Sequence, residues 1–133
     1  VSGEQDAGKL AAWALAQAPE TPFLLYSSDD PAEVAAIQDK LGRERAGETV
    51  EHAFAQTAAL LAEGGVSRLL VAGGETSGAV VQGLGIGLLE IGPEIDPGVP
   101  WTRVAQGRDM VIALKSGNFG APDFFLKAWA LLR

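Results

Sequence analysis

Hydrophobic and polar residues follow one another in blocks that predict helices and strands in alternation. Blocks with helical propensity and spacing lie at residues 7–18, about 31–41, 48–65, about 76–82 and 122–133. Short apolar runs typical of strands lie at residues 23–26, 68–72, 86–92 and 109–116. Residues 94–104 read as a Pro/Gly turn that leads into a further extended segment. Strands that alternate with helices indicate an α/β domain.

The order of these elements predicts how the sheet is arranged. Strands separated by helices favour a largely parallel sheet, because parallel neighbours need a crossover connection. Residues 87–104 hold two extended segments without a helix between them, which predicts one antiparallel or edge pairing. We therefore expect a three-layer, Rossmann-like α/β sandwich with a mostly parallel sheet and one antiparallel or edge strand. Residues 1–6 are polar and are expected to be loose.

Composition and charge restrict the class of protein. The chain has 133 residues, of which 47% are hydrophobic and 20% charged, as expected for one globular domain. The net charge of −7 disfavours binding to nucleic acid or to an anionic membrane, since both need a basic surface. The apolar runs are too short to span a bilayer, and we expect a cytoplasmic protein. With no cysteine and one histidine, His52, the sequence excludes disulfides, thiolate metal sites and histidine-rich clusters.

A glycine-rich segment, LVAGGETSGAVV, joins the end of a predicted strand to the start of a helix. Gly73 and Gly74 allow positive φ and let a ligand approach the backbone closely. The N–H groups of the first helical turn lack partners within the helix and lie at the positive end of its dipole, so they can hold an anion or phosphate. Thr76 and Ser77 add hydroxyl donors. Glu75 does not suit a bare phosphate, but it can hold Mg²⁺ through water or bond a ribose or base.

This segment departs from the known phosphate-loop motifs. Gly73 and Gly78 match the spacing of the two P-loop glycines, but Ala79 and Val80 stand where that motif requires Lys and Ser or Thr. The segment does not match Gly-x-Gly-x-x-Gly either. Taken alone, the glycines of this segment are explained equally well by a tight turn between strand and helix and by a ligand-binding loop.

A second loop of similar design follows another predicted strand, in ALKSGNFG. Ser116, Gly117, Asn118 and Gly120 form a small polar loop that exposes its backbone ahead of a helix. Lys115 stands at the strand end, where its ammonium group can reach a phosphate. A solvated lysine and an ordinary loop with Asn in the left-handed region are the alternatives. Ligands bind outside the carboxyl ends of strands in open α/β sheets, so two such loops predict the opposing walls of one crevice.

Other residues carry weaker signals. His52 lies in a predicted helix and is expected at the surface or at an edge rather than as a general base. A hydrolase triad with Ser77 is disfavoured, because Glu75 stands where the Gly-x-Ser-x-Gly elbow needs its first glycine. Trp101 is left open between the core, an interface and a base-binding position. Three acidic residues are expected to be solvated: Glu90, Glu94 and Asp96.

The two loops together resemble a known family. LVAGGETSGAVVQGLGI, followed by MVIALKSGNFG and DFF, is similar to the C-terminal nucleotide-binding domain of the four-carbon acid sugar kinases, which include threonate, erythronate and 3-oxo-tetronate kinases. The similarity extends from about PFLLYSS to the end of the chain. It implies a reaction in which ATP phosphorylates the 4-hydroxyl of a tetronate-like sugar acid.

The resemblance also implies which residues bind the nucleotide. The family's contacts map onto Gly73, Gly74, Glu75 and Thr76 in the first loop and onto Gly117 or Gly120 in the second. With the neighbouring polar residues, the candidate cofactor-binding set is Gly73, Gly74, Glu75, Thr76, Ser77, Lys115, Ser116, Gly117, Asn118 and Gly120. The expected cofactors are ATP and Mg²⁺, and no catalytic base is assigned.

The family has a larger N-terminal domain that holds the sugar acid and supplies acid and base residues, and nothing in this sequence corresponds to it. Its nucleotide domain also begins with an earlier strand that carries a Ser-rich ATP contact, and this chain is expected to start after that strand. Residues 1–133 are therefore expected to be a single nucleotide-binding domain, a C-terminal fragment of a two-domain kinase that is inactive alone. The expected partners are a nucleotide and a sugar acid bound through the missing domain, and a homo-oligomer is compatible with the sequence.

Two alternatives stay open at this point. The chain could be a non-catalytic binding module for a nucleotide or a phosphorylated metabolite, with similar loops and no substrate domain. It could also be a structural or interaction domain whose glycines only serve the turns. Nucleotide binding separates the first two hypotheses from the third, and an N-terminal substrate domain in the parent gene separates the kinase from the binding module.

Overall fold

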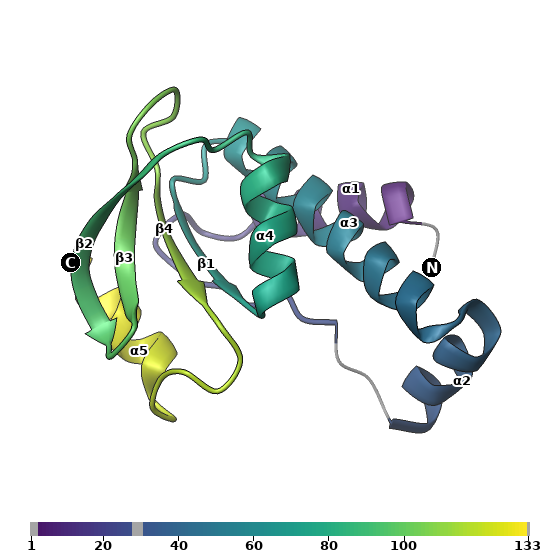
Figure 1. Ribbon diagram of the computed structural model, residues 1–133. Coiled ribbons are helices and arrows are strands. Elements are labelled where there is room, and N and C mark those ends of the chain that lie inside the picture. Colours follow the sequence, from purple (N-terminus) through teal and green to yellow (C-terminus); the bar gives the residue numbers. More distant parts are fainter. Residues whose placement is uncertain (1–2, 28–30, 133) are drawn as a thin grey trace.

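The computed structural model describes residues 3–27 and 31–132, which form helices around one four-stranded sheet (Figure 1). The helices are α1 (Gly3–Leu15), α2 (Pro31–Leu41), α3 (Arg43–Glu63), α4 (Gly74–Gly83) and α5 (Phe124–Ala130). The strands are β1 (Arg68–Ala72), β2 (Leu89–Asp96), β3 (Val99–Val104) and β4 (Val111–Lys115). The predicted α/β class is confirmed, and the helix at 31–41 and the strand at 68–72 have the predicted bounds.

The sheet is mixed, so the prediction of a mostly parallel sheet is wrong. The strand order is β1-β4-β3-β2, and only β1 and β4 pair in parallel, whereas β4 with β3 and β3 with β2 are antiparallel. The turn at Pro97 and Gly98 and the connection at residues 105–110 are both too short for a crossover. These short connections therefore force the antiparallel pairings. The antiparallel pairing predicted within residues 87–104 is confirmed as the β2–β3 hairpin.

The strand predicted at residues 23–26 does not form. Phe23 and Leu25 are half-buried and pack against a cluster formed by α1 and α3, whereas Leu24 and Tyr26 are exposed. Phe23 also meets Trp13 of α1 edge-on, with ring centroids 6.0 Å apart. The apolar run thus correctly indicated contact with the core. Burial of side chains does not require backbone pairing, however, and the segment has irregular structure.

The N-terminal region is more ordered than its polarity predicts. Residues 3–6 belong to α1, so the expectation of a loose start is wrong for them, and residues 1–2 lie outside the described part of the chain. Ala7, Ala11 and Ala14 are buried and lie on one stripe of α1, where their small side chains allow close packing against α3. This packing stabilises the whole helix, including its polar first turn.

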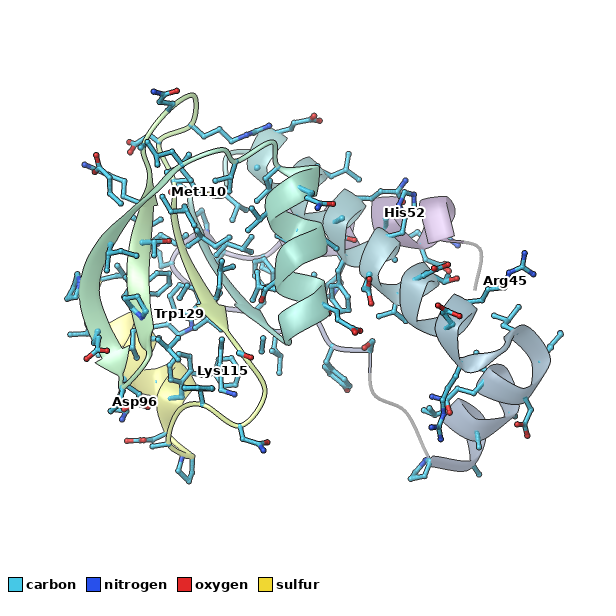
Figure 2. All side chains as sticks on the ribbon, in the orientation of Figure 1. Arg45, His52, Asp96, Met110, Lys115 and Trp129 are labelled. Carbon is cyan, nitrogen blue, oxygen red and sulfur yellow. The ribbon has the colours of Figure 1, made fainter. Side chains whose placement is uncertain are left out.

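The hydrophobic core has two main parts, one on each face of the sheet. On one face, residues of α3 and α4 pack with β1, β3 and β4. On the other face, α5 packs against β2, β3 and β4 (Figures 1 and 2). The adjacent residues Ile112 and Ala113 of β4 face these two clusters in turn, and both are completely buried. The central strand β4 is therefore covered by helices on both sides.

Trp101 belongs to the core, which settles the position that the sequence left open. It is 2% exposed, and its indole Nε1–H donates a 2.9 Å hydrogen bond to the carbonyl oxygen of Ala128 in α5. Its ring lies 5.7 Å from that of Trp129. The indole thus fastens α5 to β3 and satisfies its polar group inside the core. His52 is exposed on α3, as predicted.

None of the described helices combines the length and the apolar character needed to cross a lipid bilayer.

Candidate functional site

The two glycine-rich loops lie side by side at the carboxyl ends of β1 and β4. These strands pair in parallel, with Ala72 opposite Lys115, so both loops leave the same edge of the sheet (Figure 1). The backbone N–H of Gly73 continues the ladder and donates a 2.8 Å hydrogen bond to the carbonyl oxygen of Lys115. A Cβ placed on Gly74 would lie 3.8 Å from Ser116 Oγ. The predicted convergence of the loops at one edge is therefore present in the fold.

The first loop presents an uncapped helix N-terminus. Gly73 has φ of 113° and ψ of 130°, and no side chain of the described residues caps the first N–H groups of α4. A Cβ on Gly73 would lie 3.4 Å from Thr76 Oγ1, so the glycine keeps the start of the helix open. α4 also begins at Gly74 rather than near Thr76 as predicted, which brings its free N–H groups closer to the end of β1. These groups can donate to an anion.

Side chains of the first helical turn differ in their surroundings. Ser77 is 8% exposed, and its hydroxyl oxygen is buried without a hydrogen-bond partner among the described residues. Glu75 is exposed and lies close to Glu51 of α3. Partial burial raises the pKa of Glu51, and the carboxylate of Glu75 raises it further. A positive charge placed between these two carboxyl groups would relieve their repulsion.

The second loop is shaped by its glycines and by Lys115. Gly117 and Gly120 have positive φ, at 24° and 93°. The Lys115 ammonium donates a 2.6 Å hydrogen bond to the carbonyl oxygen of Gly117 and lies 6.0 Å from the centre of the Phe124 ring. The side chain of Asn118 is exposed. Lys115 is therefore folded over its own loop, at the edge that faces the start of α4.

Sequence reasoning missed three residues near this site. Glu51 contacts Glu75 from α3, and Asp96 and Lys127 form an ion pair beside the second loop. Asp96 was expected to be solvated, but its side chain is only 11% exposed, so that prediction is wrong. The turn sequence Asp-Pro-Gly could have drawn attention to Asp96. Its partner lies 31 residues away, and no local pattern connects the two.

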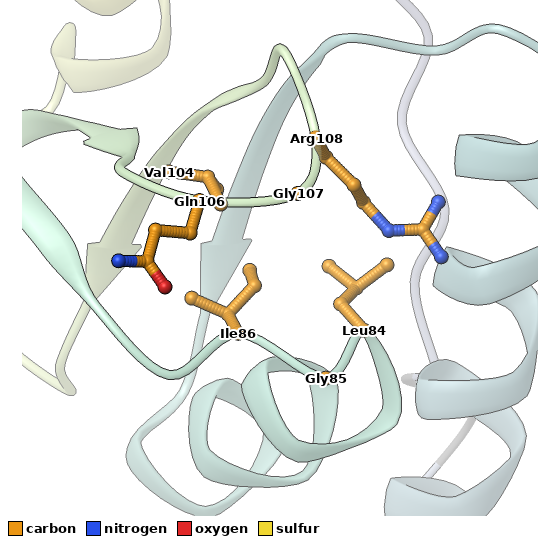
Figure 3. A pocket seen from close by; sticks show the side chains of 7 residues that line it. All are labelled: Leu84, Gly85, Ile86, Val104, Gln106, Gly107 and Arg108. Carbon is orange, nitrogen blue, oxygen red and sulfur yellow. The ribbon is translucent and has the colours of Figure 1, made fainter.

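Cavities lie both beside this edge of the sheet and far from it. A cavity of about 370 Å³ lies between Leu84, at the end of α4, and the turn that carries Arg108 (Figure 3). It is at the opposite end of α4, and none of the predicted site residues lines it. A second cavity, of about 450 Å³, is mostly apolar and borders Thr76. Among the described residues, no group of three His, Cys, Asp or Glu side chains is arranged to hold a metal ion.

Comparison with known proteins identifies the family. The family model described as "Nucleotide-binding C-terminal domain" matches residues 2–125. The 3-oxo-tetronate kinase of Pseudomonas fluorescens is 52% identical over 117 residues, which cover 88% of this chain and 27% of that protein. The 3-oxo-tetronate kinase of Burkholderia multivorans is 52% identical over 126 residues, which cover 95% of this chain and 29% of that protein. The chain thus spans less than a third of the length of these relatives.

Two solved structures share the fold of this chain at substantial sequence identity. A Haemophilus influenzae protein matches with a TM-score of 0.87 and 38% identity, over 100% of this chain and 34% of that one. A Salmonella typhimurium protein matches with a TM-score of 0.85 and 46% identity, over 94% of this chain and 30% of that one. Sequence and fold lead to the same conclusion, and the chain belongs to the nucleotide-binding C-terminal domain family of the four-carbon acid sugar kinases.

Proposed function

We propose that this chain binds Mg·ATP between the N-terminus of α4 and the loop at residues 115–120. In this proposal it is the nucleotide-binding part of a kinase that transfers the γ-phosphate to the 4-hydroxyl of a tetronate-like sugar acid. The observation that carries the proposal is the direct contact of the two loops, through the 2.8 Å hydrogen bond from Gly73 N to Lys115 O. The names of the curated relatives support the kinase class and the sugar-acid substrate.

The residues of the two loops fit the phosphates of a nucleotide. The backbone N–H groups at the start of α4 would donate to phosphate oxygens, and glycine at positions 73 and 74 lets the ligand approach them. The unpartnered hydroxyl of Ser77 lies in the same helical turn. Lys115 would exchange the carbonyl of Gly117 for a phosphate oxygen and place a positive charge there. These groups supply positioning and charge neutralisation, which phosphoryl transfer chiefly requires.

A magnesium ion would complete the charge balance of this site. With a net charge of −7, the chain has no general attraction for a nucleotide, so binding depends on local donors. Glu75 is the acidic residue in the first turn of α4, and its carboxylate would hold Mg²⁺ through water. The ion would neutralise the transferring phosphate. The described residues offer no arranged base for the sugar hydroxyl, and we assign that role to another part of the kinase.

The first test is a titration of the 133-residue chain with Mg·ATP, Mg·ADP and inorganic phosphate, followed by amide NMR. We expect shifts centred on residues 73–78 and 116–120 with both nucleotides. Silence at both loops up to millimolar nucleotide contradicts the proposal for this chain. Shifts with free phosphate alone would indicate a simple anion site rather than a nucleotide site.

A lysine variant tests the role of the second loop. Replacing Lys115→Met removes the only cation on this loop and should weaken Mg·ATP binding about tenfold, because a charge-assisted hydrogen bond is lost. Lys40→Met, in the last turn of α2, is the matched control and should leave the Kd unchanged. Isothermal titration calorimetry measures both values. Equal affinities for the two variants would remove Lys115 from the site.

A further inference from the structure

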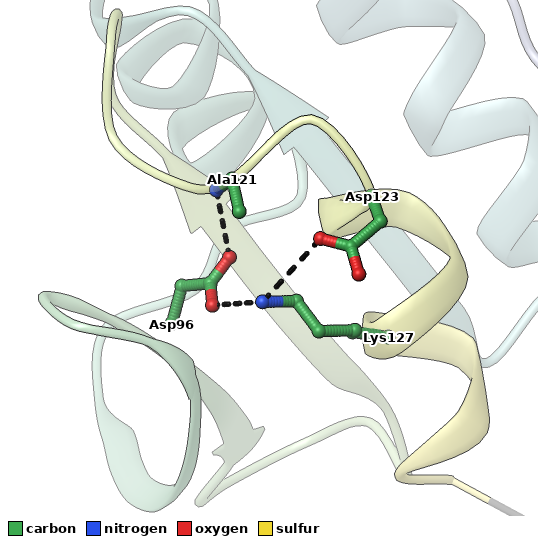
Figure 4. Close-up of polar contacts among 4 residues, drawn as sticks. All are labelled: Asp96, Ala121, Asp123 and Lys127. Carbon is green, nitrogen blue, oxygen red and sulfur yellow. Dashed lines mark hydrogen bonds and ion pairs between the residues drawn. The ribbon is translucent and has the colours of Figure 1, made fainter.

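The tip of the β2–β3 hairpin contacts the second loop through Asp96. The carboxylate of Asp96 accepts a 2.9 Å hydrogen bond from the backbone N–H of Ala121, just after the loop (Figure 4). Its other oxygen accepts a hydrogen bond from the ammonium of Lys127 in α5, which also lies 3.6 Å from Asp123 (Figure 4). One carboxylate thus connects the end of β2, the end of the loop and α5.

The side chains of Asp96 and Lys127 are shielded in part from solvent and are both charged. Its side chain is 11% exposed, and that of Lys127 is 38% exposed. The hydrogen bond from Lys127 lowers the pKa of Asp96, and the one from Ala121 lowers it further. The same bond to Asp96 raises the pKa of Lys127. Both groups are therefore charged at neutral pH, and the bond to Ala121 N–H is charge-assisted.

A second contact fixes the loop to the same hairpin. Phe119 lies over Gly98 in the β2–β3 turn, where a Cβ would come within 2.9 Å of the ring carbon Cε1. The N–H of Gly98 is held by the carboxylate of Glu94 at 3.0 Å. Phe119 and Ala121 flank Gly120, so the hairpin holds the loop on both sides of this glycine. Within the loop itself, Phe119 N–H donates to Ser116 O at 3.1 Å.

We propose that Asp96 is a positioning residue that holds the loop at residues 115–120 in place for the nucleotide phosphates. The inference rests on the proposed function, because the loop must bind the nucleotide for its position to matter. Asp96 itself does not touch the ligand. It restricts the loop to the conformation that faces the start of α4, so that the ordering of the loop is completed during folding rather than on binding.

Replacing Asp96→Ala tests the inference on the 133-residue chain. The Kd for Mg·ATP should rise about tenfold, because the loop loses its charge-assisted anchor. Asp96→Asn keeps an oxygen that can accept from Ala121 N–H, and its Kd should fall between those of Asp96→Ala and the unaltered chain. Binding by Asp96→Ala within twofold of the unaltered chain overturns the inference.

Two controls separate positioning from a general loss of stability or charge. Asp109→Asn also removes one carboxylate, from an exposed pair with Arg103 at 3.6 Å, and should bind as the unaltered chain does. Thr102→Val removes the buried 2.6 Å hydrogen bond to the carbonyl oxygen of Ile112 and destabilises the sheet away from the loop. If Thr102→Val weakens Mg·ATP binding as much as Asp96→Ala does at a similar unfolding free energy, Asp96 has only a structural role.

A double-mutant cycle shows whether Asp96 acts through the loop. In a Lys115→Met background, Asp96→Ala should raise the Kd by clearly less than it does in the unaltered chain, since part of the loop's contribution is already lost. Full additivity overturns the inference. Failure of the unaltered chain to bind Mg·ATP is a different result: it contradicts the proposed function and this inference with it. Normal binding by the unaltered chain and by Asp96→Ala contradicts the inference alone.

Discussion

At the scale of single residues, the glycines with positive φ fall into two kinds. Some allow a backbone conformation that other residues rarely adopt, and some also make room for a neighbouring atom. Gly120 is of both kinds: its φ is 93°, and a Cβ would come within 2.8 Å of Phe124 Cδ2. Gly107, in the turn before β4, has a similar φ of 91° but nothing within 4 Å. Comparing substitutions at Gly107 and Gly120 therefore separates the cost of positive φ from the cost of steric overlap.

Replacing Gly107→Ala should lower the free energy of unfolding by about 1–2 kcal/mol, because alanine is strained at positive φ. Gly120→Ala should lower it by about 1–3 kcal/mol more, since the overlap with the buried Phe124 ring adds to the same strain. Urea unfolding of both variants measures the two effects. Equal losses would mean that the Phe124 ring moves aside freely and that contact with it does not shape the loop.

At the scale of elements, α4 is held close to α3 by the absence of a side chain. A Cβ on Gly83 would lie 3.0 Å from Ala55 Cβ and 3.2 Å from the Ala55 carbonyl oxygen. The backbone of α3 cannot move by itself, so the distance between the two helices depends on this glycine. Gly78 lies in the same helix, is exposed and has nothing within 4 Å of the position of its Cβ.

The same substitution should therefore have opposite effects at these two glycines. Gly78→Ala should raise the free energy of unfolding by about 0.5–1 kcal/mol, because alanine favours the helix. Gly83→Ala should lower it by about 1–3 kcal/mol, since the contact with α3 exceeds the gain in helix propensity. Chemical denaturation followed by circular dichroism checks both signs. A stabilised Gly83→Ala protein would show that α3 and α4 separate at little cost.

Elements also show where sequence patterns succeed and fail. The bounds of α2 and β1 agree with prediction because Pro31 and the Gly73–Gly74 pair mark them locally. The segment at 23–26 was predicted as a strand from its apolar run, but two of its side chains pack against α1 and α3 without backbone pairing, and no local pattern distinguishes the two outcomes. α3 begins at Arg43, earlier than predicted, and its first turns are polar, so no apolar stripe marks this start.

At the scale of the whole molecule, an acidic chain places two carboxyl groups together beside the proposed anion site. Glu51 and Glu75 come from different helices and lie close to each other, and the net charge of −7 gives no compensating positive field. The pKa of Glu51 is raised, so the folded chain binds a proton more readily than the unfolded chain does. The ionised form of Glu51 therefore opposes folding above its unfolded pKa of about 4.5.

Replacing Glu51→Gln should raise the free energy of unfolding at pH 7 and leave it unchanged below the pKa of the unfolded glutamate. The difference should develop as the pH rises from about 4.5 through the raised folded pKa, because only the ionised group is unfavourable. Glu20→Gln, exposed in the connection after α1, also removes one carboxylate and is the control. A variant that is destabilised at pH 7 would show that Glu51 is favourably paired. Added Mg²⁺ should reduce the difference if the ion binds Glu75.

The sequence alone determined those features that depend on neighbouring residues. The apolar runs, the caps and the glycine pairs predicted most elements, and the two polar loops predicted the edge of the sheet where the candidate site lies. The resemblance to the family rests on the segments around residues 70–86 and 110–125, because specific short motifs lie there. These features are local, and the physical forces behind them act within a few residues.

Only the tertiary structure decided the order of the strands in the sheet, the burial of Trp101 and the partner of Asp96. Short connections exclude crossovers, but the position of each strand in the sheet depends on how both faces are covered by helices at once. The pair of Asp96 and Lys127 joins residues far apart in the chain, and its formation depends on the packing of α5 against β2 and β3. Such contacts result from the free energy of the complete fold, to which every element contributes.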